Sequence, residues 1–88
     1  MRRDKCLGYQ QITGLSTVKT LVPPDGATYA LIQAEAQSVR WRDDGTNPSA
    51  SVGMIITANT YLEYTGNPAT FKFIEVTSGA ILNISYYS

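Results

Sequence analysis

The sequence predicts a small all-β protein, an antiparallel β-sandwich of jelly-roll type with about seven or eight short strands. Three observations lead to this fold class. Thr, Val, Ile and Tyr, which suit a pleated and half-buried surface, recur along the chain. Turn-forming residues interrupt it about every ten positions, a spacing typical of sandwiches and barrels. No window of helical length carries an amphipathic apolar stripe that is free of Gly and Pro.

The first two strands are expected over residues 10–14 and 17–22. The segment PPDG at 23–26 predicts a turn, because its prolines fix φ and its Asp-Gly pair supplies a left-handed position. Residues 27–41 contain good helix formers and are the only serious helix candidate. Their apolar side chains nevertheless recur with a period of two, so we predict one or two strands there.

The second half of the chain is expected to alternate between short strands and turns. A loop, DDGTNPSAS, follows Trp41. Further strands are predicted at 52–57, 60–65, 70–76 and 81–87, with turns GNPA at 66–69 and TSGA at 77–80.

Alternation within these strands predicts which faces are buried. Leu82, Ile84 and Tyr86 share one face of the last strand, with Asn83 and Ser85 opposite. The strand at 70–76 is apolar on both faces, whereas a lone small sandwich should have one wet face. We therefore expect its outer face to meet another protein, or its register to shift at a bulge.

The 88-residue length predicts one domain, residues 8–88, preceded by a flexible N-terminal arm at residues 1–7. Domains of this size are often stabilised by disulfides, metals or partner subunits. The single cysteine, Cys6, cannot form an internal disulfide, and the chain has no histidine to bind zinc. We therefore expect a homo-oligomer, either a dimer or a trimer.

The charge is balanced, with seven basic and seven acidic residues. Arg2, Arg3 and Lys5 form a short basic head, but no basic stripe follows that could bind nucleic acid specifically. No segment reaches the roughly 18 apolar residues of a membrane span, and the start lacks the apolar region of a signal peptide. One unpaired thiol fits a reducing compartment, so we expect a protein that is made and kept in a cytoplasm, or assembled there into something larger, without a membrane partner.

The block RWRDDG at 40–45 is the densest chemical motif in the chain. Without histidine, only carboxylates could act as a general base near neutral pH. Asp43 and Asp44 are adjacent, so on a strand they would point to opposite faces. We expect no catalytic residue, no cofactor and no enzymatic activity. A calcium loop is an open alternative, although the spacing of the oxygen-bearing side chains departs from that of an EF-hand.

The structural interpretation of this block assigns each residue a local role. Trp41 is expected to be buried on the same face as Val39, where it is a large part of a small core. Asp43 or Asp44 is expected to accept backbone N–H groups in an Asx-turn, and Gly45 is expected to adopt a positive φ.

Tyrosines and arginines are the candidate contacts with a partner, because both residue types are enriched in protein interfaces. Arg40 and Arg42 would share the wet face of their strand and reach Glu35 or a partner's carboxylate. The candidate interface residues are Arg2, Arg3, Tyr9, Arg40, Arg42, Tyr61, Tyr64, Tyr86 and Tyr87.

The segments YALIQAEAQSVRWRDDGTNPSASVGM, LEYTG and FKFIEVTSGAILNISYY resemble a group of small structural proteins of tailed bacteriophages and prophages. The resemblance covers about residues 8 to 87. It implies a virion component, assembled in the host bacterial cytoplasm, that binds the major capsid protein or another virion protein as a head decoration or cement protein. It brings no catalytic residues. The alternatives are a tail or head–tail component, or a small carbohydrate- or calcium-binding β module that uses Trp41, the tyrosines and the acidic loop.

Overall fold

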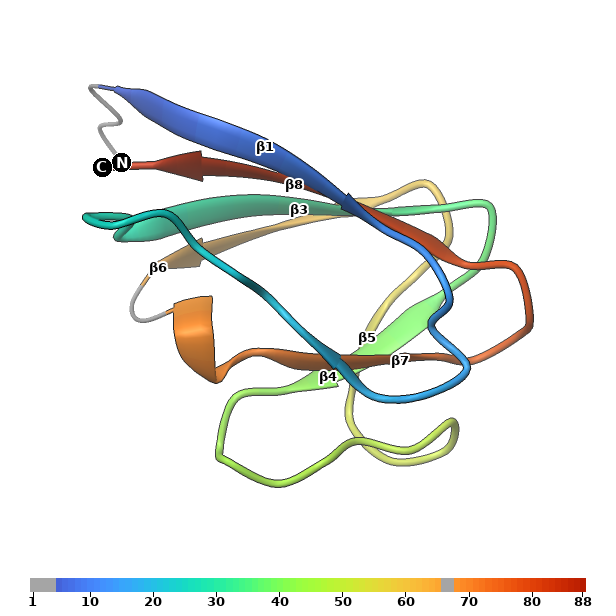
Figure 1. Cartoon of the computed structure of the whole chain (residues 1–88). Coiled ribbons are helices and arrows are strands. Elements are labelled where there is room, and N and C mark those ends of the chain that lie inside the picture. The colour runs from blue at the N-terminus through green and yellow to red at the C-terminus, as the bar shows by residue number, and fades with distance from the viewer. Residues whose placement is uncertain (1–4, 66–67) are drawn as a thin grey trace.

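The computed structural model describes residues 5–65 and 68–88, which form a β-sandwich of two four-stranded antiparallel sheets. Figure 1 shows the two sheets stacked as layers. The predicted all-β fold is confirmed. Apart from strands, the described residues contain one 3₁₀ turn, Pro68–Thr70. The strands are β1 Cys6–Ile12, β2 Lys19–Thr20, β3 Tyr29–Glu35, β4 Val39–Arg42, β5 Met54–Ile56, β6 Tyr61–Thr65, β7 Lys72–Glu75 and β8 Ile81–Tyr87.

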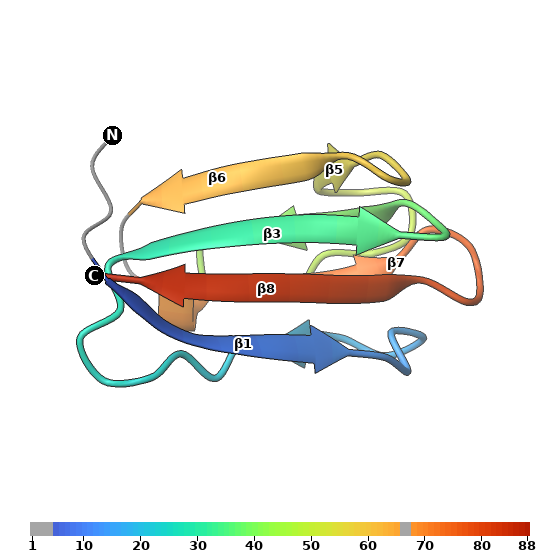
Figure 2. The same ribbon diagram turned by 90° about the horizontal axis from the view of Figure 1, so that it is seen from above.

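The strand order is that of a jelly roll. Sheet A has the order β1-β8-β3-β6, and sheet B has the order β2-β7-β4-β5. The eight strands thus pair from the outside of the chain inward, β1 with β8, β2 with β7, β3 with β6 and β4 with β5. Figure 2 shows sheet A from above, with β8 lying between β1 and β3.

The core lies between the two sheets and follows the predicted alternation. Leu82, Ile84 and Tyr86, which share one face of β8, are all buried. In sheet B, Phe71 just before β7 and Phe73 within it are both fully buried, and their rings stack with centroids 5.0 Å apart. Burial of apolar area of this kind is the main favourable contribution to folding.

Local turn chemistry follows the sequence closely in several places. In the PPDG turn, the Ala27 N–H donates to the Pro24 carbonyl at 3.2 Å, and Gly26 has a φ of 87°. The helix candidate at 27–41 is two strands, β3 and β4, joined by a tight turn at Ala36. There the Gln37 N–H donates to the Glu35 carbonyl at 2.9 Å, and Ala36 has a φ of 73°, as in a γ-turn with a positive central φ.

The N-terminal part differs from the prediction. β1 begins at Cys6, so the expected boundary between arm and domain at residue 8 falls inside a strand. The pairing of β1 with β8 shifts its register between Cys6 and Gly8, and this irregularity hides the strand from a period-two pattern. The expected interface residues Arg2 and Arg3 lie outside the described residues. So do two positions of the expected turn at 66–69.

No helix of the described residues is long and apolar enough to cross a membrane.

Candidate functional site

Trp41 of the RWRDDG block lies on the core side of sheet B, as expected. Its ring packs against Phe71 at a centroid distance of 4.6 Å and edge-on against Tyr64 at 6.5 Å. Val39, two residues earlier on the same face, is fully buried. Trp41 itself is only half-buried, and it lines a shallow hollow together with Met54. The tryptophan is therefore part of an aromatic cluster at the margin of the core.

The two arginines of the block bind the chain's own loop, which corrects the expectation that they reach Glu35. Arg40 donates through Nη1 to the Gly53 carbonyl at 2.8 Å and through Nε to the Ala50 carbonyl at 3.2 Å. Arg42 forms a two-point ion pair with Asp44, two residues further on. The partner of Glu35 is instead the side-chain amide of Asn83, 2.8 Å away.

Residues 43–53 form a loop that folds back along the outer face of sheet B, and we call it the return loop (Figure 1). Arg40 holds its second half, as described above. Lys72 of β7 holds its first half by donating to the Gly45 carbonyl and to Asn47 Oδ1, both at 3.3 Å. The loop also buries Pro48.

The return loop explains why β7 has apolar residues on both of its faces. Ile74 points outward, lies opposite Arg40 in register and is half-buried. The outer face of sheet B is thus covered in part by this chain's own residues, without a second subunit.

The acidic residues of the return loop are engaged in local contacts. Asp44 accepts the Thr46 N–H at 3.2 Å, the expected Asx-turn, and Gly45 has the expected positive φ of 86°. The hydrogen bonds from Arg42 hold the pKa of the Asp44 carboxyl below its ordinary value. Asp43 instead accepts the Tyr64 hydroxyl at 3.0 Å. Burial, followed by this contact with Asp43, raises the pKa of Tyr64.

Within residues 5–65 and 68–88, no group of three or more His, Cys, Asp or Glu side chains is placed to hold a metal ion. The two carboxylates of the return loop that could have joined in a calcium site point to different partners, Arg42 and Tyr64.

The tyrosines predicted to contact a partner separate into two groups. Tyr86 is only 2 % exposed, and its hydroxyl donates to Gln10 Oε1 at 2.7 Å. It is a core residue, and the prediction that it contacts a partner is wrong. Tyr64 and Tyr87 are half-buried, and the Tyr87 ring packs edge-on against Tyr29 at 5.7 Å. Tyr9 and Tyr61, by contrast, are 63 % and 65 % exposed.

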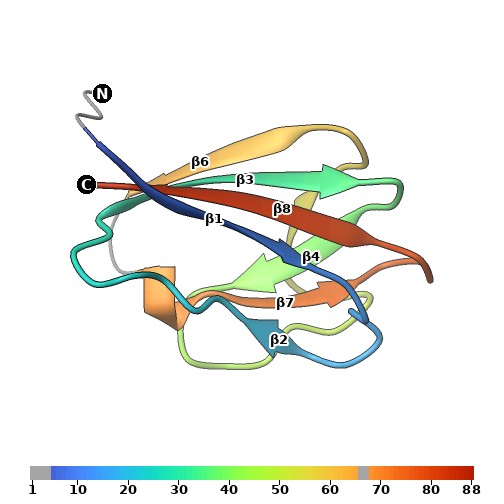
Figure 3. The same ribbon diagram turned by 45° about the horizontal axis from the view of Figure 1, so that its top comes forward.

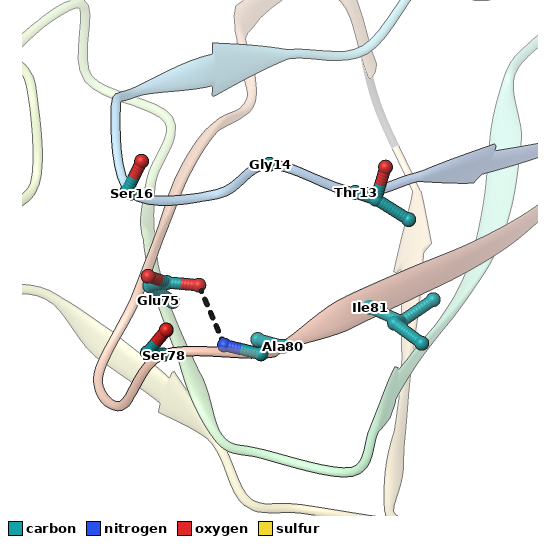
Figure 4. A pocket seen from close by; sticks show the side chains of 8 residues that line it. Thr13, Gly14, Ser16, Glu75, Ser78, Ala80 and Ile81 are labelled. Atoms are coloured by element: carbon teal, nitrogen blue, oxygen red, sulfur yellow. Dashed lines mark hydrogen bonds between the residues drawn. The ribbon is translucent and has the colours of Figure 1, made fainter.

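One hollow lies at the end of the sandwich, between the β1–β2 connection and the β7–β8 turn (Figure 4). It encloses about 280 Å³, and its one carboxylate is Glu75. That carboxylate accepts the Gly79 N–H at 3.3 Å and so holds the turn. Its remaining lining consists of short polar, apolar and glycine residues. A carboxylate in a hollow can indicate a catalytic or binding site, but Glu75 here stabilises the β7–β8 turn.

A second, shallow groove of about 260 Å³ lies on the outer face of sheet A. Figure 3 shows sheet A as the upper layer and the return loop at the bottom, below sheet B. The residues that line the groove come from all four strands. They are Tyr9, Leu31, Gln33, Tyr61, Asn83 and Ser85.

Sequence reasoning found the two tyrosines of this groove but missed its amides. The available signal was the position of Asn83 and Ser85, which alternate with the buried Leu82 and Ile84 and so must face outward. What the sequence could not provide was the strand order that places Gln33 beside Asn83.

No family model matches the chain, and no match was found among curated proteins or solved structures.

Proposed function

We propose that this chain is a non-enzymatic structural protein of a tailed-bacteriophage virion, and that it decorates the head by binding the major capsid protein. The resemblance of residues 8–87 to small phage structural proteins supports this proposal. The fold adds weaker support, since jelly rolls recur in viral capsid proteins and also in lectins. Because one fold hosts many functions, the proposal depends mainly on a particular surface.

The observation that carries the proposal is an apolar strip along the edge of sheet B. Val52, Met54 and Ile55 are 55 %, 61 % and 47 % exposed, and β5 is the last strand of its sheet. An exposed apolar edge strand is unfavourable in an isolated protein, because it is ready to bind another chain. We call these three residues the β5 edge strip: Val52 lies just before the strand, and Met54 and Ile55 lie on its two faces.

The surroundings of the β5 edge strip have the arrangement of a protein interface. Met54 lies beside Trp41 in register, and the two residues line a shallow hollow of about 330 Å³. The rest of the hollow is formed by Arg42, Asp43 and Asp44. An apolar centre with a charged margin is the usual anatomy of protein–protein interfaces, in which Trp, Met and Arg are enriched.

The same strip supports self-association. A second copy could cover the β5 edge strip by an isologous contact in a dimer, or by a heterologous contact in a closed trimer, and either would stabilise a domain whose own core is small. We therefore propose that the free protein is a dimer or trimer. Light scattering over a range of concentrations tests this. If the protein is a monomer at every concentration, self-association is refuted and the β5 edge strip would bind only the major capsid protein.

The central experiment uses virions of the phage or prophage that encodes the chain. Purified heads and tails are separated, and the copy number of the chain in each fraction is measured by quantitative mass spectrometry. We expect many copies in the head fraction. Recovery in the tail fraction alone would make the chain a tail component, and absence from both fractions would overturn the proposal.

A matched pair of variants tests the surface. Met54→Asp places a charge in the β5 edge strip, whereas Val22→Asp makes the same type of change at a site that is 72 % exposed and lies outside the strip. Both side chains are mostly in solvent, so both variants should fold. We expect heads to incorporate the Val22 variant at the wild-type level and to lose the Met54 variant. Equal incorporation of both would rule out the β5 edge strip as the binding surface.

A further inference from the structure

The outer face of sheet A is an uncovered surface of the described molecule. In Figure 2 no other described segment crosses in front of its four strands. The registers place Tyr9, Ser85, Leu31 and Glu63 in one cross-strand row. Tyr61 lies on the opposite edge strand, two residues further along. On standard sheet spacing the two tyrosines are about 14 Å apart across the strands and about 7 Å apart along them.

The two tyrosine rings are presented differently. The Tyr9 hydroxyl donates to Asn83 Oδ1 on the neighbouring strand at 2.5 Å, so this ring lies over the sheet and keeps one face towards solvent. Tyr61 makes no such hydrogen bond within the described residues and is 65 % exposed. Together they form two aromatic platforms at diagonally opposite corners of the groove.

A fixed array of amides fills the space between the platforms. Asn83 accepts from Tyr9 and from Gln11 Nε2, and it donates to Glu35 at 2.8 Å and Gln33 at 3.4 Å. All four of its hydrogen-bonding positions are occupied, so its orientation is fixed. Gln33 Nε2 and Gln11 Oε1 have no partner within the described residues, which leaves a donor and an acceptor directed at solvent. The amide of Asn83 at the centre is therefore held rigidly, while the solvent-directed groups of Gln11 and Gln33 at the margin can bind a ligand.

The charge of this face selects the class of ligand. The four strands of sheet A contain no lysine or arginine, and their charged side chains are Glu35 and Glu63. All basic residues after Lys5 lie instead in sheet B. Single-stranded nucleic acid also stacks on tyrosines, but its phosphates need positive charge. A phosphate-free ligand therefore fits this face.

The arrangement also differs from that of a protein interface. Interfaces have an apolar centre and a polar rim. Here the fixed amide of Asn83 lies near Leu31 at the centre of the groove, and the aromatic rings are at its rim. A groove of about 260 Å³ is small and open compared with pockets that enclose small molecules. An extended, uncharged ligand with apolar ring faces and many hydroxyl groups matches both features.

We propose that the outer face of sheet A binds a neutral oligosaccharide, with sugar rings against Tyr9 and Tyr61 and hydroxyl groups bonded to Gln33 and Gln11. This site is on the sheet opposite the β5 edge strip and does not depend on the proposed role in the virion.

The test is a titration of the isotope-labelled protein, followed by NMR of the backbone and side-chain amides. The probes are α1,4- and β1,4-linked glucose tetrasaccharides and a β1,4-linked N-acetylglucosamine tetrasaccharide, each at millimolar concentration, with oligothymidylate as the charged competitor class. We expect at least one tetrasaccharide to shift the side-chain amides of Gln11, Gln33 and Asn83, and oligothymidylate to leave them unchanged. If none of the tetrasaccharides shifts these amides, or if oligothymidylate alone does, the proposal is overturned.

Variants distinguish stacking from indirect effects. Tyr61→Ala should weaken binding about tenfold, whereas Tyr61→Phe keeps the ring and should bind within about twofold of the wild type. Tyr9→Phe removes the hydroxyl that fixes its ring on Asn83, so it should weaken binding although the ring is retained. Met54→Asp, on the other sheet, should have no effect. Unaltered affinity of Tyr61→Ala would place the sugar elsewhere and refute the site.

Discussion

Gly53 provides a direct test of whether the return loop packs against sheet B. It has a φ of 139°, and a Cβ added there would lie 3.1 Å from the Trp41 carbonyl oxygen, 3.2 Å from Pro48 Cβ and 3.3 Å from Arg40 Cβ. A side chain in a sparsely populated backbone region of this kind costs about 1–3 kcal/mol. Overpacking against three neighbours adds about 1–3 kcal/mol. We therefore expect Gly53→Ala to lower the free energy of unfolding by about 2–6 kcal/mol.

Gly45 in the same loop is the matched control. Its φ is 86°, but a Cβ there would have no neighbour within 4 Å. Gly45→Ala should therefore cost only the conformational part, about 1–2 kcal/mol. The difference between the two variants mainly reflects the packing of the loop on β4, because only Gly53 has neighbours that an added Cβ would meet.

Urea unfolding of both variants, monitored by tryptophan fluorescence, measures this difference. Unchanged slopes with a lower midpoint for Gly53→Ala than for Gly45→Ala are expected. If the two midpoints coincide, the return loop does not lie against the sheet, and the explanation of the two-faced β7 fails with it.

Three further predictions concern the core and one strained turn. Burial raises the pKa of Tyr86 to about 12. Because the unfolded side chain ionises near pH 10, the free energy of unfolding should be fully retained below pH 10 and fall by about 2–3 kcal/mol as the pH rises to 12. Urea melts over this range should show a smaller fall for Tyr86→Phe, and an identical fall in both proteins would contradict the assignment. In the same assay, Phe71→Ala should lower the free energy of unfolding by about 3–5 kcal/mol. Trp41→Ala should lower it by less, because Trp41 is only half-buried. A larger loss for Trp41→Ala than for Phe71→Ala would show that the core is centred elsewhere. Ala36→Gly should raise the thermal midpoint, with a gain of up to about 1 kcal/mol, because it relieves the positive φ of an exposed turn residue; a lower midpoint would contradict the turn geometry.

Much of the fold could be predicted because local chemistry and burial agree. Residues 81–87 alternate cleanly, and β8 occupies that predicted range. Gly26 and Gly45 adopt the positive φ values that their turns require. β1 was predicted too late and too short. Its register shift at Gly8 interrupts the alternation, and its charged surroundings look like a loose terminus.

The candidate site was predictable only in part, because exposure depends on strand order. Tyr9 and Tyr86 look alike as residue types, yet one is 63 % and the other 2 % exposed. The alternation of β8 did place Tyr86 with Leu82 and Ile84, and that grouping should have outweighed its residue type. The hydrogen bond between Asn83 and Glu35 joins residues 48 positions apart in the sequence, and no local sequence pattern predicts such a contact.

The position of β8 in sheet A has a consequence for folding kinetics. This last strand of the sequence lies between β1 and β3, so sheet A cannot be completed during synthesis until residues 81–87 have left the ribosome. Until then β1 lacks its strand partner, and the chain must close its longest loop to obtain one. Such non-local pairing is slow, with typical folding times of milliseconds to seconds. A nascent chain would meanwhile expose apolar residues of the future core, which makes this interval the one in which aggregation competes with folding.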